Sequence, residues 1–125
     1  MMSKSEAVIR RILGTERINV LPLSYAIEIT AHCLFIQHMR MDDLMMERDV
    51  YSVAAKRLHK DPVTVTRNIT RAANRCRDKI KAEGWSGRYI GEMVKDIGDP
   101  NMMIKYLAYY AYYDRPYYEV IGKRL

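Results

Sequence analysis

The spacing of apolar residues along the chain predicts helices and no strands. Over several segments, apolar residues recur at every third or fourth position, which places them on one face of an α-helix. No segment alternates apolar and polar residues with the period of two that is typical of a half-buried β-strand. The pattern therefore predicts an all-α fold, a compact bundle of about six helices that forms one domain over residues 1–125.

Capping and turn residues predict where the first helices begin and end. Ser3 and Glu6 have the spacing of a capping box, and Gly14 follows the last apolar residue of this helix. Pro22 suits the first turn of a second helix, whose apolar pattern runs to about Met39. The beginning of the chain therefore predicts two helices joined by a short loop.

The middle of the chain, about residues 50–83, predicts two helices separated by a short turn. Asp49 is expected to cap the first helix, and Asp61 followed by Pro62 is a strong start for the second. The turn between them contains His59, for which a left-handed backbone conformation is expected. A helix, a turn of three or four residues and a longer helix together form a helix-turn-helix.

Glycine and proline residues predict the divisions in the last third of the chain. Gly84 and Gly87 are expected to end the long helix. Further helical segments are expected around residues 89–97 and 101–113, and Pro116 is expected to end the last of them. No repeat or linker-like segment separates these elements from the rest, which agrees with a single domain.

The long helix that begins near Pro62 has two faces of different chemistry. At about 100° per residue, its apolar positions fall within one narrow stripe: Val65, Ile69, Ala72, Cys76 and Ile80. Arg67 lies almost opposite this stripe. The positions around Arg67 on the polar face are Val63, Thr64, Thr70, Arg71 and Asn74. In the preceding helix, Ala54 and Ala55 are small where the two helices must cross closely.

The polar face carries side chains that can read bases in the major groove of DNA. Arginine bridges O6 and N7 of guanine, asparagine pairs with adenine, and threonine offers a methyl group to thymine and a hydroxyl to bases or phosphates. We expect base contacts from Arg67, Thr64, Thr66, Thr70 and Arg71. We expect phosphate contacts from basic residues around the turn and along the same helix, namely Lys56, Arg57, Lys60 and Arg75.

The positive charge of the chain is concentrated in this helix-turn-helix. The formal net charge is +6, and the segment from Glu47 to Arg88 alone holds eleven Lys and Arg residues against five Asp and Glu. The rest of the chain has equal numbers of both signs. A local excess of positive charge is typical of a surface that binds phosphates, although an Arg-rich helix face is also common as a solvated surface. Double-stranded DNA is therefore the predicted partner, and transcription regulation is the predicted function.

The same residues resemble a known family. The stretch "VYSVAAKRLHKDPVTVTRNITRAANRC", residues 50–76, resembles the DNA-binding effector domain of the master sporulation response regulator of endospore-forming bacteria, the stage-zero sporulation A family. The stretches "VIRRILG" and "RPYYEVIGKRL" are similar to the first helix and the end of that domain. The resemblance implies a compact helical bundle with the recognition helix in the middle.

The resemblance also implies a difference in the DNA contacts. Members of that family contact DNA through a Ser, an Arg, a Glu and a second Arg of the recognition helix. The corresponding positions of this chain hold Val63, Thr64, Thr66 and Arg67, so that only the second Arg is retained. A different target sequence, or weaker and less specific binding, is the expected consequence. The family's receiver domain has no counterpart in these 125 residues, so we expect a free-standing regulator or an effector domain of a longer protein.

Tyrosines are concentrated near the end of the chain, where seven of the ten lie between Tyr106 and Tyr118. The simplest interpretation is an aromatic stripe that packs on the bundle with its hydroxyls at the wet edge. A homodimer contact through Tyr109 and Tyr113 is a second interpretation, and stacking on unpaired bases is a third. The alternative function is a protein-interaction module of the same fold that has lost DNA reading and binds a partner through this Tyr-rich segment.

The remaining residue types point to no cofactor and no reaction. Cys33 and Cys76 lie on apolar stripes without a Cys-x-x-Cys spacing and are expected to be reduced core thiols. Metal-ligand spacings, phosphate loops and nucleophile motifs are absent, so no metal, cofactor or enzymatic activity is expected. The N-terminus does not read as a signal peptide, and no stretch reaches the roughly 20 apolar residues of a membrane span, so a soluble cytoplasmic protein is expected.

Overall fold

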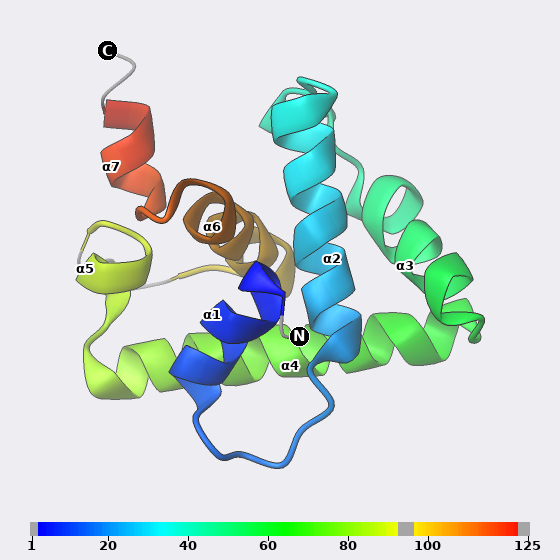
Figure 1. Cartoon of the computed structure of the whole chain (residues 1–125), viewed down its shortest axis with the longest axis horizontal. Helices are drawn as coiled ribbons and strands as arrows, with labels where there is room; N and C mark the ends of the chain where they lie inside the picture. The colour runs from blue at the N-terminus through cyan, green and yellow to red at the C-terminus, as the bar shows by residue number, and fades with distance from the viewer. Residues whose placement is uncertain (1–2, 93–96, 123–125) are drawn as a thin grey trace.

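Helices account for all the regular structure that the computed structural model describes, which covers residues 3–92 and 97–122 (Figure 1). The α-helices are α1 Lys4–Leu13, α2 Leu21–Ala31, α3 Ser52–Leu58, α4 Pro62–Glu83, α5 Ser86–Tyr89, α6 Pro100–Tyr113 and α7 Tyr117–Gly122. Three further helical segments are the π-helix η1 His32–Ile36, the 3-10 helix η2 Met41–Asp43 and the π-helix η3 Met46–Tyr51. The predicted all-α fold is confirmed.

The long helix α4 runs along one side of the molecule, and α1, α2 and α6 pack against it (Figure 1). α3 packs beside the N-terminal half of α4, and α5 follows at its other end. The most extensive contact between two helices is that of α2 with α6. The fully buried side chains include Leu23, Ile27, Ile69, Ile104 and Leu107. None of the helices in the described ranges has both the length and the apolar composition needed to cross a bilayer.

The apolar stripe of α4 is buried as the sequence predicts. Its residues Val65, Ile69, Ala72, Cys76 and Ile80 are each 0% exposed. Burial raises the pKa of the Cys76 thiol to about 12, and Cys33 is also a buried free thiol. One face of α4 therefore belongs to the core, and the opposite face is available for another role.

The start of α4 is capped by the predicted residues. The Asp61 carboxylate accepts a hydrogen bond from the backbone N–H of Thr64 at 3.0 Å. Pro62 occupies the first position of the helix, where a backbone N–H has no partner inside the helix. The far end of α4 is as predicted at Gly84, which has a left-handed conformation with a φ of 68°, whereas Gly87 lies inside α5 and does not end the helix.

Asp61→Ala should lower the free energy of unfolding by about 1 kcal/mol, because the N–H of Thr64 loses its acceptor. Urea denaturation followed by circular dichroism measures this loss. Asp78→Ala is the control, because it removes an exposed carboxylate from the same helix without removing a cap. It should change the free energy of unfolding by less than about 0.5 kcal/mol. Equal losses in the two variants would contradict the capping role of Asp61.

The start of the helix before the turn differs from the prediction. A cap at Asp49 predicts a helix that begins at Val50, but the helical segment η3 already begins at Met46. Asp49 lies inside that segment, where its carboxylate accepts a hydrogen bond from the N–H of Met45 at 2.9 Å and pairs with Arg48 at 2.8 Å. The carboxylate reaches back to the residue before the helix instead of forward into it, so the predicted position of the cap was wrong.

The predicted end of the second helix was also wrong. The apolar pattern predicts a helix to about Met39, but α2 widens into η1, which ends at Ile36. His38 follows with a φ of 57°, a left-handed conformation that a helix cannot contain. Gln37 closes the segment through its N–H, which donates to the carbonyl oxygen of His32 at 2.9 Å.

Two predictions for the end of the chain need correction. The helix predicted around residues 89–97 is not formed over 90–92, since α5 ends at Tyr89, and 93–96 lie outside the described ranges. The helix predicted over 101–113 is confirmed as α6, but it ends at the left-handed Asp114 before Pro116 is reached. Pro116 instead precedes α7, a helix that the pattern did not predict, because proline is as well suited to the start of a helix as it is unsuited to the interior.

Candidate nucleic-acid interface

The turn between α3 and α4 has a defined backbone geometry. His59 has a φ of 53° and a ψ of 44°, which confirms the predicted left-handed conformation. The N–H of Lys60 donates to the carbonyl oxygen of Ala55 at 3.2 Å, and the N–H of His59 donates to that of Lys56 at 3.2 Å. This is the Schellman pattern, which satisfies the last carbonyl groups of a helix. The turn therefore fixes the direction in which α4 leaves α3.

The helix before the turn is anchored in the core. Ala54 is 0% exposed and Ala55 is 2% exposed, which allows the close crossing of α3 and α4 that the sequence predicts. The Tyr51 hydroxyl donates a hydrogen bond to the side-chain oxygen of Asn101 at the start of α6. Burial, together with the charge of Asp99, raises the pKa of Tyr51 to about 12, so this hydroxyl keeps its proton. The hydrogen bond between Tyr51 and Asn101 therefore joins the helical segment before the turn to α6.

The five predicted base-reading residues all lie on the first three turns of α4, but they differ in exposure. Thr64, Arg67 and Arg71 are exposed, whereas Thr66 and Thr70 are half-buried. Within the described part of the chain, neither Arg67 nor Arg71 forms an ion pair. Their guanidinium groups are therefore available to a ligand.

The hydroxyl groups of the threonines are partly used inside the protein. The hydroxyl of Thr64 donates to the Asp61 carboxylate at 3.3 Å, and the hydroxyl of Thr70 donates to the carbonyl oxygen of Arg67 at 3.2 Å. Thr66 lines a small hollow beside Tyr51, on the side of α4 that faces η3 and the start of α3. The two arginines are thus the strongest candidates for base contacts.

Three of the four predicted phosphate contacts surround the turn. Lys56 and Arg57 are exposed in the last turn of α3, and Lys60 is exposed in the turn itself. Lys56 and Lys60 line an open hollow of about 630 Å³ that also includes Asp61 and Pro62 at the start of α4. The Asp61 carboxylate caps the helix itself, so the two ammonium groups are the part of this hollow that suits a phosphate.

The fourth predicted phosphate contact, Arg75, is placed differently. Its guanidinium pairs with the carboxylate of Glu16 in the loop between α1 and α2, and this hydrogen bond raises the pKa of Arg75. Asn74, beside it on the polar face, is half-buried, and its side-chain oxygen is buried without a hydrogen-bond partner among the described residues. The polar face of α4 is therefore open over its first three turns, and at Arg75 the α1–α2 loop lies against it.

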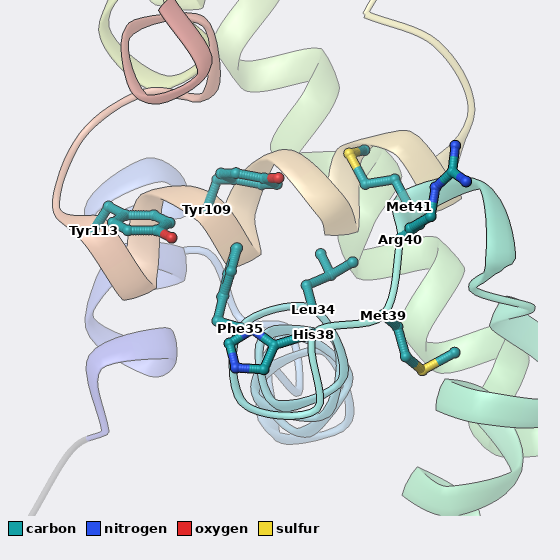
Figure 2. A pocket seen from close by; sticks show the side chains of 8 residues that line it. All are labelled: Leu34, Phe35, His38, Met39, Arg40, Met41, Tyr109 and Tyr113. Atoms are coloured by element: carbon teal, nitrogen blue, oxygen red, sulfur yellow. The ribbon is translucent and has the colours of Figure 1, made fainter. Parts of the chain in front are cut away.

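The Tyr-rich segment packs mainly inside the molecule. Figure 2 shows Phe35 beside Tyr109 and Tyr113, with ring centroids 4.8 and 5.0 Å apart. Tyr109 is only 6% exposed, so it offers little surface to a second copy of the chain. The aromatic stripe that packs on the bundle is confirmed. A cavity of about 380 Å³ lies in front of these rings and is lined by Leu34, Phe35, His38, Met39, Arg40, Met41, Tyr109 and Tyr113 (Figure 2).

Comparisons of the chain with protein-family models, with curated proteins and with solved structures found no match. Over residues 3–92 and 97–122, no three His, Cys, Asp or Glu side chains are grouped so that they could hold a metal ion. The basic face of α4, with the exposed Arg67 and Arg71, is the feature of the surface that best indicates a function.

Proposed function

We propose that the protein binds double-stranded DNA in a sequence-specific manner and regulates transcription. The observation that carries this proposal is the pair Arg67 and Arg71, which are exposed and form no ion pair with any residue in the described ranges, on a helix that is fixed by a capped turn. In this proposal the N-terminal half of α4 enters the major groove, and Arg67 contacts a base edge.

The dimensions of the exposed face agree with this role. The open part of α4, residues 62–71, is about 15 Å long at 1.5 Å per residue. An α-helix with its side chains is about 10–12 Å wide, and the major groove of B-DNA is about 12 Å wide. The groove therefore accepts this stretch together with Arg67 and Arg71.

The charges around the turn support the same orientation. Lys56, Arg57 and Lys60 lie at the N-terminal end of α4, where one strand of the duplex passes when the helix lies in the groove. Phosphate contacts position the protein, whereas base contacts select the sequence. We infer that the three cations hold the duplex while the arginines of α4 read it. The resemblance to the effector domain of the sporulation response regulator supports a regulator of this type.

A selection from a random duplex library at about 100 mM salt tests the proposal. The enriched sequence and a scrambled duplex are then titrated by fluorescence anisotropy over a salt series. We expect one enriched motif, bound at least about 1,000-fold more tightly than the scrambled duplex. Binding with a steep salt dependence and no enriched motif would replace sequence-specific regulation by non-specific DNA coating.

Lys56→Ala should weaken binding to all sequences by a similar factor, because a phosphate is present at every position of a duplex. The slope of log K against log[salt] should decrease by about one. Lys81→Ala is the matched control, because Lys81 is exposed at the far end of α4, away from the turn. A loss confined to the enriched sequence would show that Lys56 reads a base instead of a phosphate.

A protein-interaction module is the second candidate function. It is favoured by two exposed apolar side chains, Ile36 at 54% and Tyr112 at 45%, which line one hollow between α2 and α6. This surface is distant in the sequence from the basic face of α4. The absence of DNA binding in the selection would favour this surface as the functional one.

A further inference from the structure

The loop between α1 and α2, residues 14–20, is held by several hydrogen bonds. Gly14 leaves α1 with a φ of 63°, and its N–H donates to the carbonyl oxygen of Arg10 at 2.8 Å. The N–H of Ile18 donates to the carbonyl oxygen of Glu16 at 3.1 Å, which closes a tight turn of three residues. The central residue of that turn is Arg17, whose side chain is exposed.

Arg10 holds this tight turn on both sides. One nitrogen of its guanidinium donates to the carbonyl oxygen of Glu16 at 2.8 Å, and the other donates to that of Ile18 at 3.1 Å. Both carbonyl groups that flank Arg17 are therefore bound by one planar group that projects from α1. A guanidinium has a fixed fork of donors, so this arrangement limits the motion of the turn.

The same loop is joined to the polar face of α4. The Glu16 carboxylate pairs with Arg75. Figure 1 shows the loop alongside the middle of α4 and extending beyond it, on the side away from the bundle. At its far end, the side-chain oxygen of Asn19 accepts a hydrogen bond from the N–H of Leu21 at 3.2 Å, where α2 begins. The loop is thus connected to three helices.

We propose that the α1–α2 loop is a second DNA contact, in which Arg17 binds a backbone phosphate at the edge of the groove that receives α4. This inference rests on the proposed DNA-binding function. Three observations carry it: the loop adjoins the open part of α4, Arg17 is at its apex, and the carbonyl groups on both sides of Arg17 are bound by Arg10. The negative charge of Glu16 is offset by Arg75, so the loop together with Arg75 has a net positive charge, which Arg17 presents to the duplex.

This arrangement also assigns a role to Arg75. Its guanidinium holds the loop through Glu16, so it is a positioning residue and does not itself contact a phosphate. Two sets of cations then meet the duplex. The Lys56, Arg57 and Lys60 group contacts the backbone at the N-terminal end of α4, and Arg17 contacts it about four turns farther along that helix, near Arg75.

The test uses the full chain with Arg17→Ala and a mixed-sequence duplex of 30 base pairs, titrated by anisotropy over a salt series. We expect a loss of affinity of about three- to ten-fold at 100 mM salt and a decrease in the salt slope of about 0.9. Arg17→Lys should retain the slope, because it keeps the charge. Arg11→Ala is the control, because Arg11 is exposed on α1 beside Tyr110 and Asp114, away from the loop's tip.

Three outcomes would overturn the proposal in different ways. If the wild-type chain binds DNA and Arg17→Ala has the same affinity and slope, the loop contact is wrong and the proposed function stands. If Arg11→Ala has the same effect as Arg17→Ala, the effect is one of net charge and the loop is not a contact. If the wild-type chain binds no duplex, both the loop contact and the proposed function fail.

The position of the contact can be tested independently with Arg17→Cys carrying an iron chelate that cleaves nearby DNA. The two native cysteines are buried, so the introduced thiol is the one that reacts. We expect cleavage at one flank of the enriched site, on the side opposite to the phosphates that Lys56 is proposed to contact. Cleavage at the centre of the site, or an even distribution along the duplex, would overturn the assignment.

Discussion

Replacing Arg67 by alanine should reduce the affinity for the enriched DNA sequence by about 1–3 kcal/mol and abolish the preference at a single base pair. Arg67 is exposed at the middle of the open part of α4, directly opposite the buried stripe, so it reaches farthest into a groove that the helix occupies. Repeating the selection with Arg67→Ala measures the lost preference, and titration of the original site measures the affinity.

Arg67→Lys separates the two contributions of this side chain. Lysine keeps the positive charge but lacks the planar pair of donors that bridges O6 and N7 of guanine. It should therefore retain the salt dependence of binding and still lose most of the base preference. Lys56→Ala supplies the contrasting case, a loss shared by all sequences. If Arg67→Ala and Lys56→Ala weaken binding to every sequence equally, the division into base and phosphate contacts is wrong.

Ile69→Ala should lower the free energy of unfolding by about 2–5 kcal/mol. Ile69 is 0% exposed and lies on the face of α4 that packs against the bundle, so alanine leaves a cavity in a region enclosed by packed helices. Urea denaturation measures the loss. Lys81→Ala, exposed on the same helix, is the control and should change the stability by less than about 0.5 kcal/mol.

Ile69→Val refines this prediction, since it removes one methylene group and should cost about 0.5–1.5 kcal/mol. A loss below about 1 kcal/mol for Ile69→Ala would mean that the bundle closes around the smaller side chain and that the α4 stripe is loosely packed. The expected large loss would instead show that the buried stripe of α4 is tightly packed against the bundle, which holds the exposed face of the same helix in a fixed position.

Local signals account for the parts of the fold that the sequence predicts well. The stripe of α4, its Asp61 and Pro62 start and its Gly84 end all depend on residues within a few positions of one another. The same holds for the left-handed His59, because a chain that turns sharply between two helices requires such a conformation. The position of Arg67 on the open face follows from helical periodicity alone, and the structure agrees.

The parts that the sequence could not predict depend on long-range contacts. Glu16 and Arg75 are 59 positions apart, and nothing near either residue indicates the ion pair that joins them. Residue periodicity places Asn74 and Arg75 on the polar face of α4. It cannot show that the loop at residues 14–20 lies against that part of the helix. The direction in which the Asp49 carboxylate reaches is similarly undetermined by spacing, since both directions satisfy a free N–H.

In the proposed mode of DNA binding, the α1–α2 loop beside Arg75 leaves about three turns of α4, residues 62–71, to enter the major groove. A helix surface of about three turns contacts only a few base pairs, and a DNA sequence that short occurs many times by chance in a genome. In the proposed DNA-binding role, one molecule would therefore contact too few base pairs to distinguish one promoter from the rest of a genome. We expect its target sites to consist of two copies of the recognised sequence at a fixed spacing.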